Sequence, residues 1–304
     1  MPAAALGLLS AIVYGSADFL GGVAARRIGP IRTTAVGAVS GLLLLILALS
    51  LAGGVWSPAA LGWGALSGLV GSAAVGLLYA CLAIGPMSIL SPLTALVSAL
   101  VPMTWGLIGG DRFGLVGYLA IGLALVAVVL VGFVPEKGAV RPSGRALLMA
   151  VGAGAMIGLF LILLDQTPAD SGVVPLIANR AVNGAVMWTV VGLLVVRARQ
   201  RRSSGSSSGA NPSPSPSSGM EAAPRFTARG TGIASAGGAL DASANLLILI
   251  GLRAGDLTTM SVLVALYPAG TILLAAAVLR ERVAPVQWVG LVLAVAAAAL
   301  LALD

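Results

Sequence analysis

The sequence predicts an all-α integral membrane protein in which ten transmembrane helices form two inverted five-helix repeats. The prediction rests on composition, on the lengths of the apolar segments and on an internal repeat. Of the 304 residues, 59% are hydrophobic and only 9% are charged, whereas soluble domains carry about 25% charged residues. A soluble fold could not hide this much apolar surface, but a lipid bilayer removes that requirement.

The apolar segments have the length that a bilayer demands. A helix that rises about 1.5 Å per residue needs about 20 apolar residues to cross about 30 Å of hydrocarbon. A further segment, 197–229, consists mainly of Ser, Gly, Pro and Arg, and we expect it to form a flexible linker. The ten candidate spans are residues 3–25, 31–53, 60–82, 88–109, 114–134, 144–166, 171–196, 230–252, 257–279 and 285–303.

The chain matches itself at two offsets. At an offset of 143 residues Gly15 falls on Gly158, and at an offset of 170 residues Asp111 falls on Glu281. The two offsets differ by 27 residues, which is the excess length of the linker segment over its counterpart 54–59. One insertion into the second copy of a duplicated unit therefore explains both offsets.

The duplication divides the chain into two repeats of five spans each. We expect the first repeat over residues 1–134, an inter-repeat loop over 135–143 and the second repeat over 144–304, interrupted by the linker. Because five is an odd number, the second repeat enters the membrane from the opposite side to the first. Inverted repeats of this kind are typical of secondary transporters.

The positive charges predict the orientation of the chain in the membrane. Loops that follow odd-numbered spans carry 14 of the 17 Lys and Arg residues, six of them in the linker. Loops that follow even-numbered spans carry two, Arg112 and Arg253. Since positive charge is retained in the cytoplasm, we expect the linker on the cytoplasmic side of the cell membrane and both termini outside. The net charge of +7 is thus a topological signal, and we expect no nucleic-acid partner.

Three charged residues, Asp18, Arg180 and Asp241, lie well inside predicted spans. Each costs about 2.5–3.5 kcal/mol at the middle of a membrane, so we expect their side chains to face the interior of the helix bundle. Polar neighbours at helical spacing place further candidates on the same helix faces. The predicted residues for substrate binding or coupling, which would surround a central cavity, are Tyr14, Asp18, Asn179, Arg180, Asn183, Asp241, Asn245 and Tyr267.

The three charges have no counterparts in the other repeat, where Leu, Gly and Gly stand at the matching positions. This asymmetry favours a site fitted to a substrate. Arg180 is expected to pair with Asp241 or with an anionic group of the substrate, and the first alternative is also a structural lock between two helices. Asp18 is then the acid that is free to bind and release a proton, or else a hydrogen-bonded acid near a helix end.

Two prolines and two charged loops complete the candidate features. Pro102 and Pro268 interrupt the fourth and ninth spans, either as simple kinks or as hinges for alternating access. Asp111 with Arg112, and Glu281 with Arg282, occupy the tight connections after these same spans. They either mark turns at the lipid headgroups or form inter-helix loop ion pairs that close one end of a pathway.

The second half contains, in this order, Gly255, the mid-helix Pro268, the charged pair 281–282 and Gly290. With "YGSADF" at 14–19 and Asp111 in the first half, the chain resembles the drug/metabolite transporter superfamily in its ten-helix form built from two EamA-type repeats. The resemblance implies alternating-access transport of a small metabolite, drug or nucleotide-sugar-like solute, with export as the expected direction. Members of this family usually have both termini in the cytoplasm, opposite to the orientation that the charges favour.

The sequence also excludes two kinds of functional site. It contains no histidine, and its one lysine, Lys137, precedes a glycine, so neither a His-ligated metal nor a GxxxxGK[ST] phosphate loop is encoded. We expect no cofactor, no metal and no enzymatic activity, with a small-molecule substrate, membrane lipids and protons as partners. Carriage or flipping of a lipid-linked substrate is the alternative function, and a membrane-embedded enzyme or a scaffold is less favoured.

Overall fold

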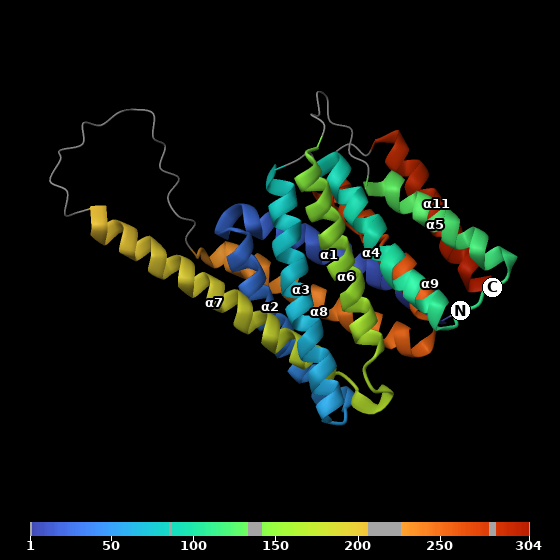
Figure 1. The fold of residues 1–304 in the computed structure, drawn as a ribbon, viewed down its shortest axis with the longest axis horizontal. Coiled ribbons are helices and arrows are strands. Elements are labelled where there is room, and N and C mark those ends of the chain that lie inside the picture. The colour runs from blue at the N-terminus through green and yellow to red at the C-terminus, as the bar shows by residue number, and fades with distance from the viewer. Residues whose placement is uncertain (1, 85–86, 133–141, 206–225, 280–283, 304) are drawn as a thin grey trace.

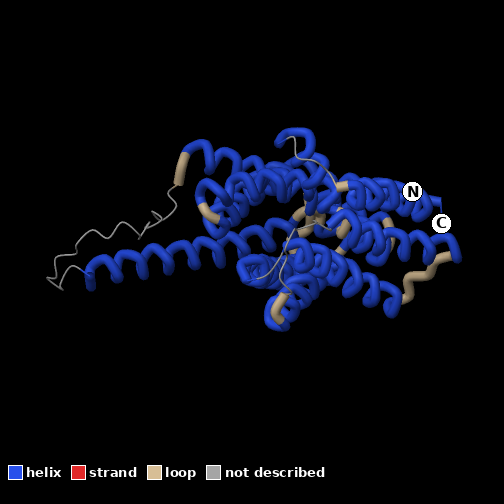
Figure 2. The backbone as a smooth tube through the Cα atoms, turned by 90° about the horizontal axis from the view of Figure 1, so that it is seen from above, coloured by secondary structure: helices blue, strands red, loops and turns tan. Residues whose placement is uncertain are grey.

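The computed structural model describes residues 2–84, 87–132, 142–205, 226–279 and 284–303 (Figure 1). Every regular element in these ranges is a helix, and loops join the helices (Figure 2). The helices are α1 (Pro2–Ile28), α2 (Pro30–Ala52), α3 (Pro58–Ile84), α4 (Met87–Gly109), α5 (Leu115–Gly132), α6 (Gly144–Asp165), the 3-10 helix η1 (Ala169–Ser171), α7 (Val174–Gly205), α8 (Ala228–Ala254), α9 (Leu257–Val264), α10 (Tyr267–Leu279) and α11 (Pro285–Leu303).

The ten spans predicted from the sequence are confirmed. Nine segments of the described chain are helical, long and apolar enough to cross a membrane, and the shorter apolar helix Leu115–Val131 supplies the tenth. The span Leu257–Val278 consists of α9 and α10 in succession. Both termini lie at the same end of the molecule, as an even number of crossings requires (Figures 1 and 2).

Local sequence explains where the helices begin. Ser143, Thr227 and Asp256 precede α6, α8 and α9, and each side chain accepts a hydrogen bond from a backbone N–H in the first turn of its helix. Proline opens α2, α3 and α11, where the first turn needs no N–H donor. Gly29, at φ 87°, reverses the chain between α1 and α2 in a single residue.

The packing of the helices repeats under exchange of the two halves. Helix α1 packs on α8 as α6 packs on α3, α2 packs on α8 as α7 packs on α3, and α1 packs on α10 as α6 packs on α4. Helices α2 and α7 contact each other, as do α5 and α11. These main contacts thus have partners under a two-fold exchange, which is the packing expected of two inverted repeats.

Matched glycines show the same symmetry at the level of single residues. A Cβ atom on Gly15 of α1 would overlap the backbone of α10 at Thr271, and a Cβ on Gly158 of α6 would overlap Val101 of α4. The sequence offsets relate Gly15 to Gly158 and Thr271 to Val101. Small residues let membrane helices approach closely, so both repeats use the same glycine for the same contact.

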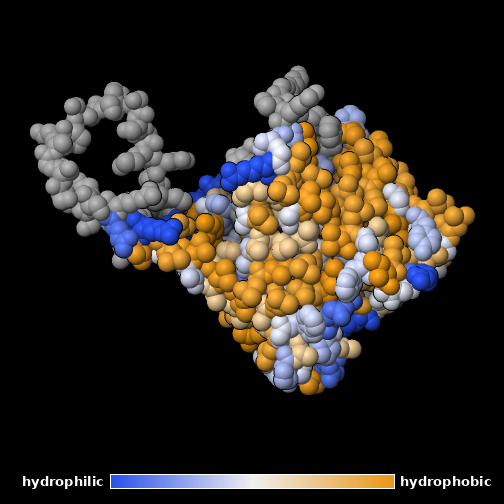
Figure 3. All heavy atoms as spheres, viewed as in Figure 1, coloured by the Kyte–Doolittle hydropathy of each residue, from blue (hydrophilic) through white to orange (hydrophobic). Residues whose placement is uncertain are grey.

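The outer surface is apolar. Large exposed side chains such as Leu47, Ile108, Leu115 and Val292 lie on α2, α4, α5 and α11. Figure 3 shows a broad hydrophobic surface over the helix bundle, with hydrophilic residues gathered toward its ends. An exposed surface of this composition is stable in contact with lipid and unstable in water.

The seventh helix is longer than predicted. Helix α7 runs to Gly205, although the linker was expected to begin at residue 197 (Figure 1). The prediction is wrong at this end because Arg, Ala and Gln are good helix formers and continue a helix beyond the membrane. Helix α8 begins at Ala228, and the remainder of the predicted linker, 206–225, lies outside the described residues, as does most of the inter-repeat loop 135–143.

A candidate substrate cavity

A cavity of about 250 Å³ lies inside the bundle. Residues from α1 to α4 and from α6 to α10 line it, whereas α5 and α11 pack against each other away from it. The structure brings every side chain that the sequence predicted for substrate binding or coupling to this wall, namely Tyr14, Asp18, Asn179, Arg180, Asn183, Asp241, Asn245 and Tyr267.

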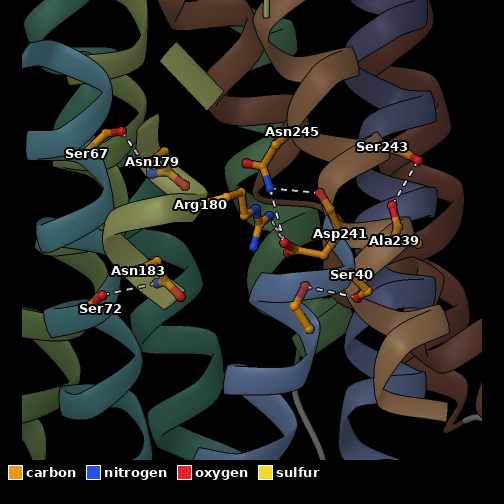
Figure 4. A network of polar contacts seen from close by, with 11 residues as sticks. Ser40, Ser67, Ser72, Asn179, Arg180, Asn183, Ala239, Asp241, Ser243 and Asn245 are labelled. Carbon is orange, nitrogen blue, oxygen red and sulfur yellow. Dashed lines mark hydrogen bonds and ion pairs between the residues drawn. The ribbon is translucent and has the colours of Figure 1, made fainter. Parts of the chain in front are cut away.

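An ion pair joins the two sides of the cavity (Figure 4). The Arg180 guanidinium on α7 donates to the Asp241 carboxylate on α8, and both side chains are largely buried, at 12% and 24% exposed. Asn245, one turn after Asp241, donates to the backbone carbonyl of that residue at 2.8 Å and to its carboxylate at 3.4 Å. Of the two predicted alternatives for Arg180, the described structure contains the pair with Asp241.

Two asparagines of α7 bind serines of α3. The amide nitrogen of Asn179 donates to the hydroxyl of Ser67 at 2.9 Å, and that of Asn183 donates to the hydroxyl of Ser72 at 3.1 Å. Both serine hydroxyls donate in turn to backbone carbonyls of their own helix. The sequence reasoning missed these serines, because a hydroxyl that bonds to its own helix costs little in a membrane span and leaves no signal in the hydropathy.

The acid of α1 occupies a different part of the wall from the ion pair. Asp18 lies one turn after Tyr14 and close to Tyr267, and the described residues offer its carboxylate no hydrogen bond or salt bridge. The rings of Tyr14 and Tyr267 are tilted by 59° with centroids 5.7 Å apart. The cavity therefore contains a carboxylate beside a pair of aromatic rings.

The repeat counterparts of the three charged residues also line the cavity. They are Leu161 for Asp18, Gly37 for Arg180 and Gly71 for Asp241. Because both members of each pair face one cavity, the pseudo-two-fold axis that relates the repeats passes through it. Each charged residue thus has an uncharged counterpart across this axis. A Cβ atom on Gly71, the counterpart of Asp241, would meet nothing within 4 Å, so this position leaves open space.

A helix break faces the cavity. The ninth span is interrupted at residues 265–266, just before Pro268, and Val264, Ala265 and Tyr267 line the cavity on both sides of the break. The interruption of the ninth span thus lies beside Pro268, whereas α4 continues through Pro102 from Met87 to Gly109. The role of either proline as a kink or a hinge stays a prediction. Discontinuous helices at the centre of a transporter commonly form its binding site.

Of the two alternatives for Asp111 and Arg112, the described structure does not contain an ion pair between them. The Asp111 carboxylate instead accepts bonds from the backbone N–H of Thr258 at 3.1 Å and from its hydroxyl at 2.6 Å, and so caps α9 of the other repeat. Arg112 donates to the backbone carbonyls of Leu107 and Asp111. An acidic side chain at a helix N-terminus satisfies orphan N–H groups. The second predicted pair, 281–282, lies outside the described residues.

Contacts between loops seal the end of the molecule at which the termini lie. Besides the bond from Asp111 to α9, Arg253 donates to the hydroxyl of Ser171 at 3.0 Å and to the carbonyl of Gly172 at 2.9 Å. The backbone N–H of Val55 donates to the carbonyl of residue 170 at 3.1 Å. These loops follow the second, fourth, sixth and eighth spans, which all end on the side of the termini.

The cavity spans the middle of the bundle. Its lining residues 14–21 of α1 and 33–38 of α2 lie toward the side on which α7 ends, whereas 157–161 of α6 and 179–183 of α7 lie toward the side of the termini. The loop contacts therefore join the two repeats beyond the cavity on the side of the termini.

Comparison with known proteins agrees with this architecture. The model of the EamA-like transporter family matches residues 1–133 and 144–303. A solved crystal structure has a TM-score of 0.67 and 16% sequence identity, with 99% of this chain and 97% of that chain covered, and this likeness shows the fold alone. None of the curated proteins matches the chain.

Fold and cavity together define a multi-pass membrane transporter of small molecules built from two inverted five-helix repeats. The chain belongs to the EamA-like transporter family, whose model accounts for both halves. The resemblance inferred from the sequence is confirmed. Among the described residues no group of three or more Cys, Asp or Glu side chains could hold a metal ion.

Proposed function

We propose that this protein is a secondary active transporter that exports a small metabolite or drug across the cell membrane by alternating access, driven by protons. The cavity is its substrate site, and Asp18 is its coupling acid. The observation that carries the proposal is a duplicated scaffold whose charged groups are not duplicated but all face one cavity. Charges required only for folding would be expected in both copies.

The size of the cavity favours a compact solute. Pockets for drug-sized ligands usually measure about 300–1,000 Å³, and this cavity measures about 250 Å³. A lipid-linked substrate would call for a larger space. Binding of a compact solute can be measured without a substrate in hand, because a ligand that binds only the native state raises thermal stability. A metabolite and drug library screened in this way on the purified protein is expected to yield stabilising compounds, and their absence would contradict the proposal.

Replacing Asp18 by Asn is expected to separate proton coupling from substrate binding. The amide has nearly the same shape but carries no titratable proton, so proton-driven uptake of a stabilising compound into proteoliposomes is expected to fall at least ten-fold. Exchange of labelled for unlabelled compound without a pH gradient is expected to persist. Uptake that still responds fully to a pH gradient in the Asn variant would remove Asp18 from the coupling step.

The seal at the side of the termini is expected to control access to the cavity. The substitution Val75→Cys places a thiol on the cavity wall, and a Cys81→Ser background makes it unique, since Cys81 is the single cysteine of the chain. Asp111→Ala removes a helix cap worth about 0.5–2 kcal/mol. A membrane-impermeant maleimide is therefore expected to label the introduced thiol from the side of the termini about 2 to 30 times faster.

The matched control is Arg112→Ala, because Arg112 bonds to the backbone of its own loop and not to α9. Its labelling rate is expected to equal that of the parent. Equal rates in the Asp111 and Arg112 variants would show that the loop contact does not hold the seal. The charge distribution also predicts that this side is extracellular, so labelling of intact cells reports the orientation.

A further inference from the structure

Two residues that line the cavity have buried amide oxygens without partners. Asn183 and Asn245 are 9% and 4% exposed, and no described group donates a hydrogen bond to the Oδ1 atom of either. Figure 4 shows both oxygens pointing toward the space between α7 and α8. A buried acceptor without a partner costs about 1–3 kcal/mol. A ligand that donates hydrogen bonds to both oxygens would recover this free energy on binding.

The surrounding bonds fix which atom of each amide is left without a partner. The hydroxyl of Ser72 donates its hydrogen to the backbone carbonyl of Gly68, so it can only accept from Asn183, and the amide must present its nitrogen to the serine. The nitrogen of Asn245 bonds to a carbonyl and a carboxylate of Asp241, which are acceptors only. Turning either amide around would bring two acceptors together, so the oxygen is the atom of each amide that is left without a partner.

The charged groups of the cavity wall, like these oxygens, favour a ligand that donates hydrogen bonds. Arg180 and Asp241 neutralise each other in their ion pair. Asp18 then leaves one net negative charge among the ionisable groups that face the cavity, the others being the hydroxyls of Tyr14 and Tyr267. The groups that are ready to receive a ligand are therefore one carboxylate and two amide oxygens, all of them hydrogen-bond acceptors.

The aromatic pair lies beside the carboxylate. A cation is attracted to the face of an aromatic ring when it lies within about 6 Å of the ring centroid. The tilted rings of Tyr14 and Tyr267, with Asp18 one turn along α1 from the first, offer aromatic faces and a countercharge to one group. Ile157, Phe160 and Leu161 of α6 make the wall partly apolar.

We infer that the substrate of this cavity is a compact organic cation that carries at least two N–H donors, such as a primary ammonium or a guanidinium, on an apolar or aromatic body. The inference rests on the proposed function and names the class of its substrate. The cation faces Asp18 and the two tyrosine rings, and its N–H groups satisfy the oxygens of Asn183 and Asn245. An anion would instead have to displace Asp241 from Arg180 while Asp18 repels it.

A matched series of small molecules tests the inference on the purified full-length protein in lipid nanodiscs. Benzyl, phenethyl and n-butyl bodies each carry an ammonium, a trimethylammonium, a hydroxyl or a carboxylate group, and the shift in melting temperature is measured as a function of concentration. The ammonium compounds are expected to bind at least ten-fold more tightly than the hydroxyl and carboxylate compounds on the same body. They are also expected to bind more tightly than the trimethylammonium compounds, which keep the charge but have no N–H donor.

Substitution of the acceptors tests the geometry directly. Asn183→Leu and Asn245→Leu are each expected to weaken binding of the best ammonium compound by about ten-fold or more, since a hydrogen bond to a charged group is involved. Ser243→Ala is the control, because Ser243 lies on the same helix as Asn245 but bonds to its own backbone outside the cavity wall. Its affinity for the compound is expected to equal that of the parent.

Three results would overturn the inference. The first is binding of a carboxylate or hydroxyl compound as tightly as its ammonium analogue, and the second is equal binding of the ammonium and trimethylammonium forms. The third is the absence of stabilisation by any ammonium compound. If a compound from the general library still stabilises the protein in that case, the cavity is a substrate site for another chemical class, and only the cation assignment fails.

Discussion

Replacing Asp241 by Ala is expected to destabilise the protein by about 3–5 kcal/mol, because it leaves the charge of Arg180 buried without a partner. The loss can be measured as the free energy of unfolding in mixed micelles. Ser243→Ala, which also removes a polar group from the same helix, is expected to have little effect. A comparably small loss in the Asp241 variant would mean that water or lipid headgroups solvate Arg180.

The double variant Arg180→Leu with Asp241→Leu separates stability from function. Replacing both members of a buried ion pair by apolar residues is often neutral or stabilising, so most of the lost stability is expected to return. Stabilisation by substrate is expected to be weaker than in the parent, because the Asn245 amide loses the Asp241 carboxylate that helps to orient it. A double variant that recovers both stability and ligand response would show that the pair is only a lock between α7 and α8.

Gly238→Ala is expected to destabilise the bundle by about 1–3 kcal/mol or more, the cost of overpacking a tight contact. A Cβ atom at this position of α8 would overlap the backbone of Gly37 on α2. The change is expected to separate these two helices, which both line the cavity, and to lower the melting temperature together with ligand binding.

Gly76→Ala is the matched control on a helix surface. A Cβ atom on Gly76 of α3 would meet nothing within 4 Å, and Ala is the better helix former by about 1 kcal/mol. This variant is expected to be as stable as the parent or more so. A Gly238 variant with the same stability as the Gly76 variant would refute the close approach of α2 and α8.

Hydropathy and the repeat were sufficient to predict the ten spans and the inverted architecture, because a bilayer imposes both the length and the composition of a helix that crosses it. The same reasoning found Asp18, Arg180 and Asp241, since a charge in a span is too costly to face lipid. It failed for the end of α7, where helix propensity continues the helix after the apolar segment has ended. Hydropathy identifies the part of a helix that lies in the membrane, but not the residue at which the helix ends.

The contacts between distant segments could not be predicted. Asp111 stands next to Arg112 in the sequence, which suggested either a turn at the lipid headgroups or a local ion pair, but its carboxylate bonds to Thr258, 147 residues away. The serines that hold Asn179 and Asn183 lie more than 100 residues before them. Such pairings depend on which helices pack together, and neither the spacing nor the composition of the chain contains that information.

Each of the three charged residues of the cavity occurs in one repeat only, which constrains how such a protein can be assembled. Two identical halves could form the same scaffold as a homodimer, because the glycine contacts recur in both. Two copies of the second half would bring two arginines and two aspartates around the centre and would lack the acid of α1, while two copies of the first half would carry no arginine–aspartate pair. The site therefore requires two unlike halves, and their fusion into one polypeptide guarantees that each molecule receives one of each.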